Sequence, residues 1–320
     1  MYVSELWCGA VVEVSSCPAC GGPLAAWRVA PAAEPELGEI ALLRCGACGS
    51  AVTAAPAPAA LYESGAYNPG PPRGSRLAAP LLRAFDAQRL RFVRAAVRPP
   101  ARLLDAGAGR GRFVAHARAM GYDATGLEPS ARGIAGAASS YGVQLQAAGI
   151  DDADVAAGSL DVITLWHVLE HLDDPGAALR TLHGWLRPGG ALIVGVPNLG
   201  SWQAQIGGRR WYHLDLPRHR THFTVTGLRR ALDRAGFDVV AEHQLLAEHN
   251  PFGMWQSAVN RVTSRPSYLF HLLKRNAPWR SRDLAITLAA LPLVPLAILL
   301  ELLGGALRRG GSVAVTARAR

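Results

Sequence analysis

The sequence carries little charge and few aromatic residues: 18% of its 320 residues are charged and 7% are aromatic, while 50% are hydrophobic. Long disordered chains have much charge and few apolar residues, so this composition excludes extended disorder and predicts a globular protein. The length allows one large domain and a small module. The first residues lack the basic segment of a secretory signal, because Glu5 precedes their short apolar run. We therefore expect a cytoplasmic protein whose thiols stay reduced.

Acidic residues are scarce in the last fifth of the chain. Residues 260–320 hold ten basic residues against only Asp283 and Glu301, a net charge of +8 within a total of +9. Residues 1–60 hold two arginines against five glutamates, a net charge of −3. A nucleic-acid-binding protein spreads basic residues over a folded face, whereas basic residues beside an apolar segment favour a membrane surface. We therefore expect no nucleic-acid partner.

Only five cysteines are present, and four of them form two Cys-x-x-Cys pairs that are each followed by glycine. Two such pairs supply the tetrahedral thiolate shell that zinc prefers, so residues 1–50 are predicted to be a zinc ribbon with a structural Zn²⁺. Residues 27–30 and 39–44 can pair as its hairpin. A redox dithiol, the alternative, needs only one pair. Cys8 is given no role, and the four predicted ligands are Cys17, Cys20, Cys45 and Cys48.

Residues 51–75 are rich in Pro, Ala and Gly and are predicted to be a linker to a second domain, 76–320. Helical spacing of apolar residues over 77–97 begins that domain. A short strand then leads through Asp105 into a turn containing Gly107 and Gly109, and a second strand ends in Glu128. Three further strands are expected at 143–148, 160–166 and 191–196. The alternation of strands and helices predicts a mainly parallel sheet with its ligand at the carboxyl ends of the strands.

Five segments together resemble the class I S-adenosylmethionine-dependent methyltransferases of the type 11/23-like groups: LLDAGAGRGRFV, GLEPS, SLDVITLWHVLEHLDDP, LRPGGALIVGVPN and HRTHFTVTGLRRALDRAGF. The resemblance covers roughly residues 77–250 and the final strand. It implies an α/β fold, a doubly wound seven-stranded sheet that is mainly parallel, and S-adenosyl-L-methionine as cofactor. A dehydrogenase is the alternative, but the glycine turn lacks the GxGxxG spacing and an aspartate stands two residues before its first glycine.

The resemblance also assigns cofactor-binding residues. It implies that Asp105, Gly107 and Gly109 line the methionine part of the cofactor and that Glu128 binds the ribose. The turn at Ile150 and Asp151 stands where the family holds adenine, although its acidic position is shifted by about one residue. Trp166 ends the next predicted strand and His167 follows it, and both are expected near the methionine.

The segment His167-Val-Leu-Glu170-His171 has the order of inverted zinc proteases. We reject that interpretation because the segment follows a strand directly, whereas the protease motif lies within a long helix. The segment is similar to the E-x-x-E-H of methyltransferases acting on ubiquinone precursors and on RNA 3′ ends, where it binds a divalent cation together with a downstream histidine. The resemblance thus implies a second cation at His167, Glu170 and His171. His167 replaces a glutamate, so a nitrogen ligand stands where the family has a harder oxygen ligand.

A second histidine-rich run, residues 211–223, follows the fifth predicted strand. It is similar to the family's P-x-H-x-x-H-F segment, so His219 and His222, with His171, are candidate catalytic residues that act as a base or orient the acceptor. The alternative is that His222 packs and caps the helix that begins near Thr224.

Residues 251–309 form a predicted helical insertion between the sixth strand, 237–246, and the seventh, 311–318. Leu284–Leu300 carries no charge over 17 residues, but it is short for a bilayer core of roughly 30 Å and contains two prolines. Because both flanking strands belong to one sheet, the segment must return as a re-entrant hairpin, a surface helix or a buried helix. The flanking basic residues favour peripheral membrane contact through 284–307; burial against a second copy in a homodimer is the alternative.

These observations predict methyl transfer to a small-molecule or lipid-linked acceptor, sugar-like or quinone-like, by a cytoplasmic enzyme at the inner face of the membrane. One alternative is a zinc-ribbon RNA methyltransferase, which the net charge of −3 on residues 1–60 disfavours. The other is a non-catalytic cofactor-binding scaffold at the membrane.

Overall fold

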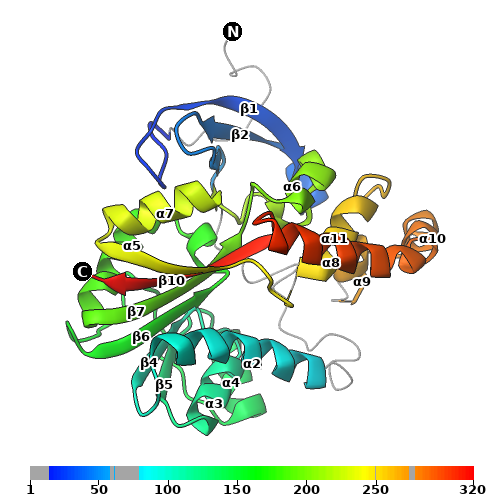
Figure 1. Ribbon diagram of the computed structural model, residues 1–320. Helices are drawn as coiled ribbons and strands as arrows, with labels where there is room; N and C mark the ends of the chain where they lie inside the picture. Colours follow the sequence, from blue (N-terminus) through cyan, green and yellow to red (C-terminus); the bar gives the residue numbers. More distant parts are fainter. Residues whose placement is uncertain (1–13, 58–60, 62–78, 249, 274–277) are drawn as a thin grey trace.

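The computed structural model describes residues 14–57, 61, 79–248, 250–273 and 278–320. These residues form a six-stranded sheet in the order β5-β4-β6-β7-β10-β9 and a four-stranded sheet in the order β1-β2-β3-β8 (Figure 1). In the large sheet β5, β4, β6 and β7 are parallel, and β10 runs antiparallel between β7 and β9. The strands of the large sheet are β4 (Arg102–Ala106), β5 (Asp123–Leu127), β6 (Leu160–Trp166), β7 (Leu186–Pro197), β9 (Phe237–His243) and β10 (Ser312–Ala319).

The predicted strand at 143–148 is the one correction to the seven strands expected in this sheet. Residues 143–148 meet β5 only through a single parallel bridge between Leu127 and Gln146. Two backbone hydrogen bonds flank that bridge, from Gln146 N–H to Gly126 and from Glu128 N–H to Gln146. The chain leaves the sheet edge directly afterwards toward the turn at Ile150, so the segment is too briefly paired to form a strand.

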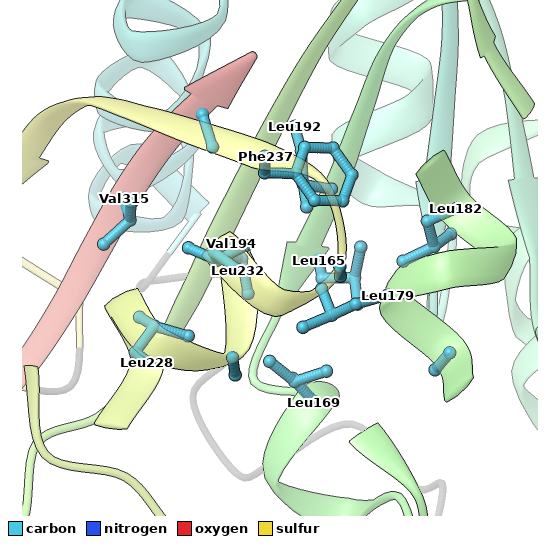
Figure 2. Close-up of a cluster of buried hydrophobic side chains, with 14 of the residues drawn as sticks. Leu165, Leu169, Leu179, Leu182, Leu192, Val194, Leu228, Leu232, Phe237 and Val315 are labelled. Carbon is cyan, nitrogen blue, oxygen red and sulfur yellow. The ribbon is translucent and has the colours of Figure 1, made fainter. Parts of the chain in front are cut away.

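Helices cover both faces of the large sheet. Adjacent residues of a strand point to opposite sides, so each face carries apolar side chains that a helix layer covers. Leu103 packs with α2 (Ala79–Ala96), α3 (Arg112–Ala119) and α4 (Ala131–Tyr141), whereas its neighbour Leu104 belongs to the opposite cluster. That second cluster includes α5 (Pro175–Trp185) and α7 (Val225–Arg234). Figure 2 shows leucines of both helices converging on Leu165 and Val194 of the sheet. The result is a three-layer α/β domain.

The four-stranded sheet joins the N-terminal segment to the α/β domain. Its strands are β1 (Leu24–Pro31), β2 (Glu39–Cys45), β3 (Ala51–Thr53) and β8 (Thr221–His222). The predicted hairpin is confirmed as the antiparallel pair of β1 and β2. The predicted linker 51–75 begins instead with a strand, because β3 pairs with β8 and sets Ala51 opposite His222. Residues 58–60 and 62–75 of that linker, like Cys8, lie outside the described residues.

The N-terminal segment is buried against the larger domain at two places. Buried Cys17 and Cys48 share a cluster with Leu228 of α7. Ile40 and Leu42 of β2 pack with Trp211 and residues near it. The N-terminal segment is therefore integrated into the fold.

The predicted insertion forms four helices beside α6 (Trp202–Gly207), namely α8 (Asn250–Val259), α9 (Tyr268–Leu273), α10 (Ser281–Ala289) and α11 (Val294–Ala306). Met254 and Trp255 of α8 are buried in a cluster with Ala297 of α11. The chain then returns directly to the sheet, where Ser312 pairs with Pro197. In Figure 1 these helices extend to one side of the sheet, away from α2 to α5. Only 17% of the most apolar stretch of this insertion is buried by the rest of the chain.

Candidate functional site

Asp105 lies near the carboxyl end of β4, which lies between β5 and β6. It is buried, and its Oδ1 accepts a hydrogen bond of 2.6 Å from the Thr164 hydroxyl, which lies opposite it on β6. Burial raises the pKa of the Asp105 carboxyl to about 7, against the opposing effect of the Thr164 hydrogen bond. Asp105 is thus a carboxyl whose charge changes near neutral pH.

The turn after β4 requires glycine at its first predicted position. Gly107 has φ 78°, and a Cβ there would lie 2.4 Å from Val168 Cγ2. Gly109 donates its N–H to Glu128 Oε2 at 2.8 Å, and Ser130 donates to Oε1 at 2.9 Å. Burial raises the pKa of Glu128, while these two N–H groups lower it. The turn and the acidic strand end therefore face each other, as the sequence predicts.

The other four predicted cofactor residues lie on neighbouring loops. Ile150 is buried and Asp151 is exposed on one turn. Trp166 ends β6 with the Arg89 guanidinium 4.8 Å above its ring. His167 follows with φ 57°, and its Nδ1 lies 3.2 Å from Glu170 Oε1. Their roles in binding the cofactor stay predictions.

Three side chains near this edge form a group that could hold a cation. Glu170, His171 and His219 each offer one ligand atom, and these atoms lie within 4.8 Å of one another. Among the described residues, the buried Oε2 of Glu170 has no hydrogen-bond partner. The predicted set of His167, Glu170 and His171 is thus altered, because His167 contacts the other oxygen of Glu170 and His219 takes its place.

The hydrogen bonds of the two histidines in this group set their tautomers. Nδ1 of His171 lies 3.2 Å from the Arg218 carbonyl oxygen, and Nδ1 of His219 lies 2.8 Å from that of His213. A carbonyl can only accept, so each Nδ1 carries the hydrogen and each neutral ring has its lone pair on Nε2. Burial lowers the pKa of His171 to about 4 and also lowers the pKa of His219. Both rings are therefore neutral at pH 7.

His222, the third candidate catalytic histidine, has different surroundings. It lies in β8, and its Nε2 is 3.0 Å from the Thr53 hydroxyl of β3. Burial lowers its pKa to about 3. The cap of α7 is the Thr224 side chain, which accepts a hydrogen bond from the Gly227 N–H. His222 thus packs within the small sheet, and Thr224 caps the helix.

A buried ionic network joins the histidines to the N-terminal segment, and sequence reasoning missed it. Arg218 is fully buried and pairs with Glu34 and with Asp215, each at 2.5 Å. Burial alone would raise the pKa of Asp215, but the charge of Arg218 outweighs it and holds that pKa well below its usual value. Asp215 Oδ2 lies 4.0 Å from His219 Nε2. No local pattern indicates a pair separated by 184 residues.

The four predicted zinc ligands converge at the other end of the small sheet, within 4.8 Å of one another. Cys17 Sγ lies 3.7 Å from Cys48 Sγ, and Cys20 Sγ lies 3.5 Å from Cys45 Sγ. A tetrahedron with Zn–S bonds of about 2.3 Å has edges of about 3.8 Å, whereas a disulfide is about 2 Å long. The four sulfurs therefore fit a zinc ribbon, with zinc itself a prediction.

Glycines close both cysteine turns. Gly21 and Gly49 have φ of 73° and 74°, and each donates its N–H to the carbonyl of the first cysteine of its pair. The second turn also contacts α7, because the Thr224 hydroxyl donates to the Cys48 carbonyl at 2.7 Å. The cysteine site thus abuts the helix that follows His222.

An α/β sheet with a glycine turn after its first strand, an acidic residue ending the next strand and histidines at the same edge defines an S-adenosylmethionine-dependent methyltransferase. The family model described as "Methyltransferase domain" matches residues 76–242, which is just over half of the chain. The chain belongs to this family and is a methyltransferase that uses S-adenosylmethionine.

Curated relatives match the chain over part of their length. The ubiquinone biosynthesis O-methyltransferase of Xanthomonas axonopodis pv. citri (strain 306) is 34% identical over 124 residues, which are 37% of this chain and 52% of that protein. The enzyme of the same name from Xanthomonas oryzae pv. oryzae (strain PXO99A) is 30% identical over 151 residues, 44% of this chain and 63% of that protein. The chain thus spans about half to two thirds of the length of these relatives.

Solved structures share the fold at low identity. A chain of the complex that contains the Haloferax volcanii Trm112 methyltransferase activator superposes with a TM-score of 0.50 and 15% identity. The match covers 77% of this chain and 93% of that one. This similarity supports the fold alone.

Proposed function

We propose that the protein transfers the methyl group of S-adenosylmethionine to a hydroxyl of a small, lipid-linked acceptor of quinone-like type. The observation that carries this proposal is the group of Glu170, His171 and His219 beside the predicted cofactor residues. Its two neutral rings offer lone pairs where a hydroxyl must lose its proton. The curated relatives, by name O-methyltransferases of ubiquinone biosynthesis, support an oxygen acceptor of this kind.

In the proposed reaction, the acceptor oxygen attacks the methyl carbon while the carbon–sulfur bond breaks and S-adenosylhomocysteine leaves. The hydroxyl proton goes to Nε2 of His219. Asp215 lies 4.0 Å from that nitrogen and stabilises the imidazolium that results. Sulfonium charge is lost in this step, so alignment of the three reacting atoms supplies most of the acceleration.

A divalent cation is the alternative to His219 as the base, because the single lone pair on Nε2 of His219 cannot both accept a proton and bind a metal. Glu170, His171 and His219 would hold it, and the buried Oε2 of Glu170, without a partner among the described residues, fits such a ligand. Two nitrogens and one carboxylate favour a first-row transition metal or zinc over magnesium. When bound, the cation would lower the pKa of an acceptor hydroxyl.

Calorimetry with S-adenosylhomocysteine tests the cofactor part. We expect Glu128→Gln to weaken binding at least about tenfold, because two ribose hydroxyls lose a charged acceptor. Asp238→Asn is the matched control, since this carboxylate is exposed on β9. Wild-type protein that binds no S-adenosylhomocysteine contradicts the assignment.

Methyl-labelled S-adenosylmethionine tests the acceptor. Detergent-dispersed long-chain phenols, water-soluble phenols and RNA are offered in parallel, and we expect label only in the phenols, with the long-chain ones preferred. His219→Gln should lower kcat by at least about 100-fold and leave cofactor affinity unchanged. Label in RNA, with an affinity that falls steeply with salt, would replace this proposal by an RNA methyltransferase. Cofactor binding without transfer to any extract fraction would replace it by a scaffold.

A further inference from the structure

We propose that the helical segment Ser281–Ala306, which consists of α10, α11 and the short turn between them and is called the apolar helix below, docks the protein on the surface of an anionic lipid bilayer. By length and composition it is the one helix among the described residues that could cross a membrane, yet only 17% of its most apolar stretch is buried. Docking stands independently of the proposed function; only the link to a lipid-linked acceptor rests on it.

The outer surface of the apolar helix consists of large aliphatic side chains. Leu288, Leu293, Leu296, Leu299 and Leu303 are each between 46% and 55% exposed. Soluble proteins rarely leave so many adjacent leucines in water unless the patch binds something. Trp279, just before the helix, is 71% exposed, and tryptophan favours the boundary between lipid and water.

Topology excludes a helix that crosses the bilayer. The strand that follows the apolar helix, β10, pairs with both β7 and β9 inside the large sheet. The chain before the helix comes from β9 in that same sheet. Both ends of the helix therefore lie on one side of a membrane, and the helix must rest in the interface plane.

The exposed charged side chains at the two ends of the apolar helix are basic. Arg280 and Arg282 at the start of the apolar helix, and Arg308 and Arg309 just past its end, are all exposed. The two acidic residues of the insertion point inward: Asp283 accepts hydrogen bonds from Ser264, and Glu301 accepts them from Gln203 and Gly311. The apolar surface is thus bordered by arginines, which complement anionic headgroups.

The same charge disfavours a second copy of the chain as the occupant. A twofold interface through this face would bring the four arginines of one protomer toward the four of the other, and like charges facing each other are destabilising. An anionic bilayer accepts both the leucines and the arginines. The observations therefore favour lipid.

The apolar helix also borders a cavity of about 370 Å³. Gly305, Ala306 and Arg308 line one side of it, and Phe92 and His243 line another. His243 ends β9, and Phe92 lies 6.5 Å from Trp166 between ring centroids, so the cavity opens at the edge that carries the predicted cofactor residues. A docked protein would therefore present this edge to a lipid-linked acceptor.

Cosedimentation with vesicles tests the docking. We expect the full chain to sediment with vesicles of phosphatidylglycerol and phosphatidylcholine, to bind pure phosphatidylcholine at least about tenfold more weakly, and to be released by high salt. Replacing Arg280, Arg282, Arg308 and Arg309 by Gln should lower the affinity at least about 100-fold, because each basic residue contributes a several-fold factor. Leu296→Ser/Leu299→Ser/Leu303→Ser should abolish binding.

Matched controls keep the test specific. One control replaces four exposed arginines on or just after α2 by Gln, which removes the same charge elsewhere and should change binding less than about threefold. These arginines are Arg83, Arg91, Arg94 and Arg98. Leu81→Ser/Met120→Ser/Val240→Ser removes three exposed apolar side chains elsewhere. S-adenosylhomocysteine binding, measured on every variant, reports that each is folded.

Two outcomes overturn the inference. One is a folded wild-type protein that ignores anionic vesicles at low salt. The other is a stable dimer in analytical ultracentrifugation that the triple serine variant separates, which would assign the surface to a second copy. Either result leaves cofactor binding and methyl transfer untouched, so failure of the docking is distinguishable from failure of the proposed function.

Discussion

The ribbon segment, residues 14–57, and the apolar helix are both additions to a methyltransferase domain; each buries acidic side chains, and the two differ in the side chains that they leave exposed. The ribbon segment sends Glu34 into the fold, where it pairs with the fully buried Arg218. The apolar helix turns its acidic side chains inward and leaves its leucines and arginines outside. Net charge alone, −3 for residues 1–60 and +8 for residues 260–320, does not reveal this difference.

The comparison shows which addition supports the site. Through β3 the ribbon segment pairs with β8, and the Thr53 hydroxyl donates to the His219 carbonyl at 2.5 Å. The apolar helix contacts the fold along one side only and exposes the other. Unfolding of the ribbon segment should therefore displace the histidines of the site, whereas substitutions on the outer side of the apolar helix should leave them in place.

The largest effect is expected from Cys17→Ser/Cys20→Ser. Metal binding supplies much of the folding free energy of a small zinc module, so we expect zinc content to fall from one per chain to none and the free energy of unfolding to fall by at least about 3 kcal/mol. Methyl transfer should be lost because β3 and β8 separate. Metal analysis and urea unfolding measure the change, with Cys8→Ser as the control thiol. A double variant with full zinc content and stability would refute the ribbon.

The ionic network provides the next test. Arg218→Met leaves Glu34 and Asp215 without their cation, and breaking a buried pair in this way costs about 3–5 kcal/mol. Arg209→Gln is the control, because Arg209 pairs with Glu39 where both side chains are about half exposed, and the expected loss is under about 1 kcal/mol. Chemical unfolding measures both. Equal losses for the two variants would remove the distinction between buried and exposed pairs.

Cofactor affinity should depend on the α/β domain and on neither addition. We therefore expect its pH dependence to follow the ionisation of Asp105. The pKa of Asp105 is raised to about 7, and the ionised form attracts the positive charges of S-adenosylmethionine. Affinity should therefore rise about tenfold from pH 6 to pH 8 as the carboxyl loses its proton. Asp105→Asn should remove this dependence in calorimetry across that range, while the Arg209→Gln control keeps it. A flat wild-type profile would contradict the raised pKa.

The smallest effect is expected on the stability of the triple serine variant of Leu296, Leu299 and Leu303. Exposed apolar side chains contribute little to folding, so the free energy of unfolding should change by less than about 0.5 kcal/mol. Leu165→Ala, in the buried cluster, should cost about 2–5 kcal/mol by contrast. Chemical unfolding without lipid is the measurement. A loss above about 2 kcal/mol for the triple variant would show that these leucines are covered in solution.

Local patterns in the sequence predicted much of the fold. Glycine spacing and alternating apolar residues located the turn at Gly107 and the strands around it, and the paired cysteines located the metal-binding group. The segment 143–148 has strand-like alternation, but pairing at a sheet edge depends on how long the chain follows its neighbour. That length is a tertiary property without a local signal.

The parts that could not be predicted depend on residues far apart in the chain. The short strand β3 pairs with β2, which is near it in the chain, but its second partner β8 lies about 170 residues later, and no local pattern indicates that pairing. His219 joins Glu170 and His171 because its run folds back over the sheet edge, whereas the adjacent motif favoured His167. Arginine is usually exposed, so the sequence does not indicate that Arg218 is buried, and its two carboxylate partners are what make its burial favourable.

The position of β10 between β7 and β9 governs the order of events during synthesis on the ribosome. Neither earlier strand can find its final neighbour until residues 312–319 have left the exit tunnel. By then the apolar helix has already been translated and lies outside an unfinished sheet. Under the proposed docking, contact between its leucines and a nearby membrane would therefore precede closure of the sheet, and the nascent chain would complete its fold at the lipid surface.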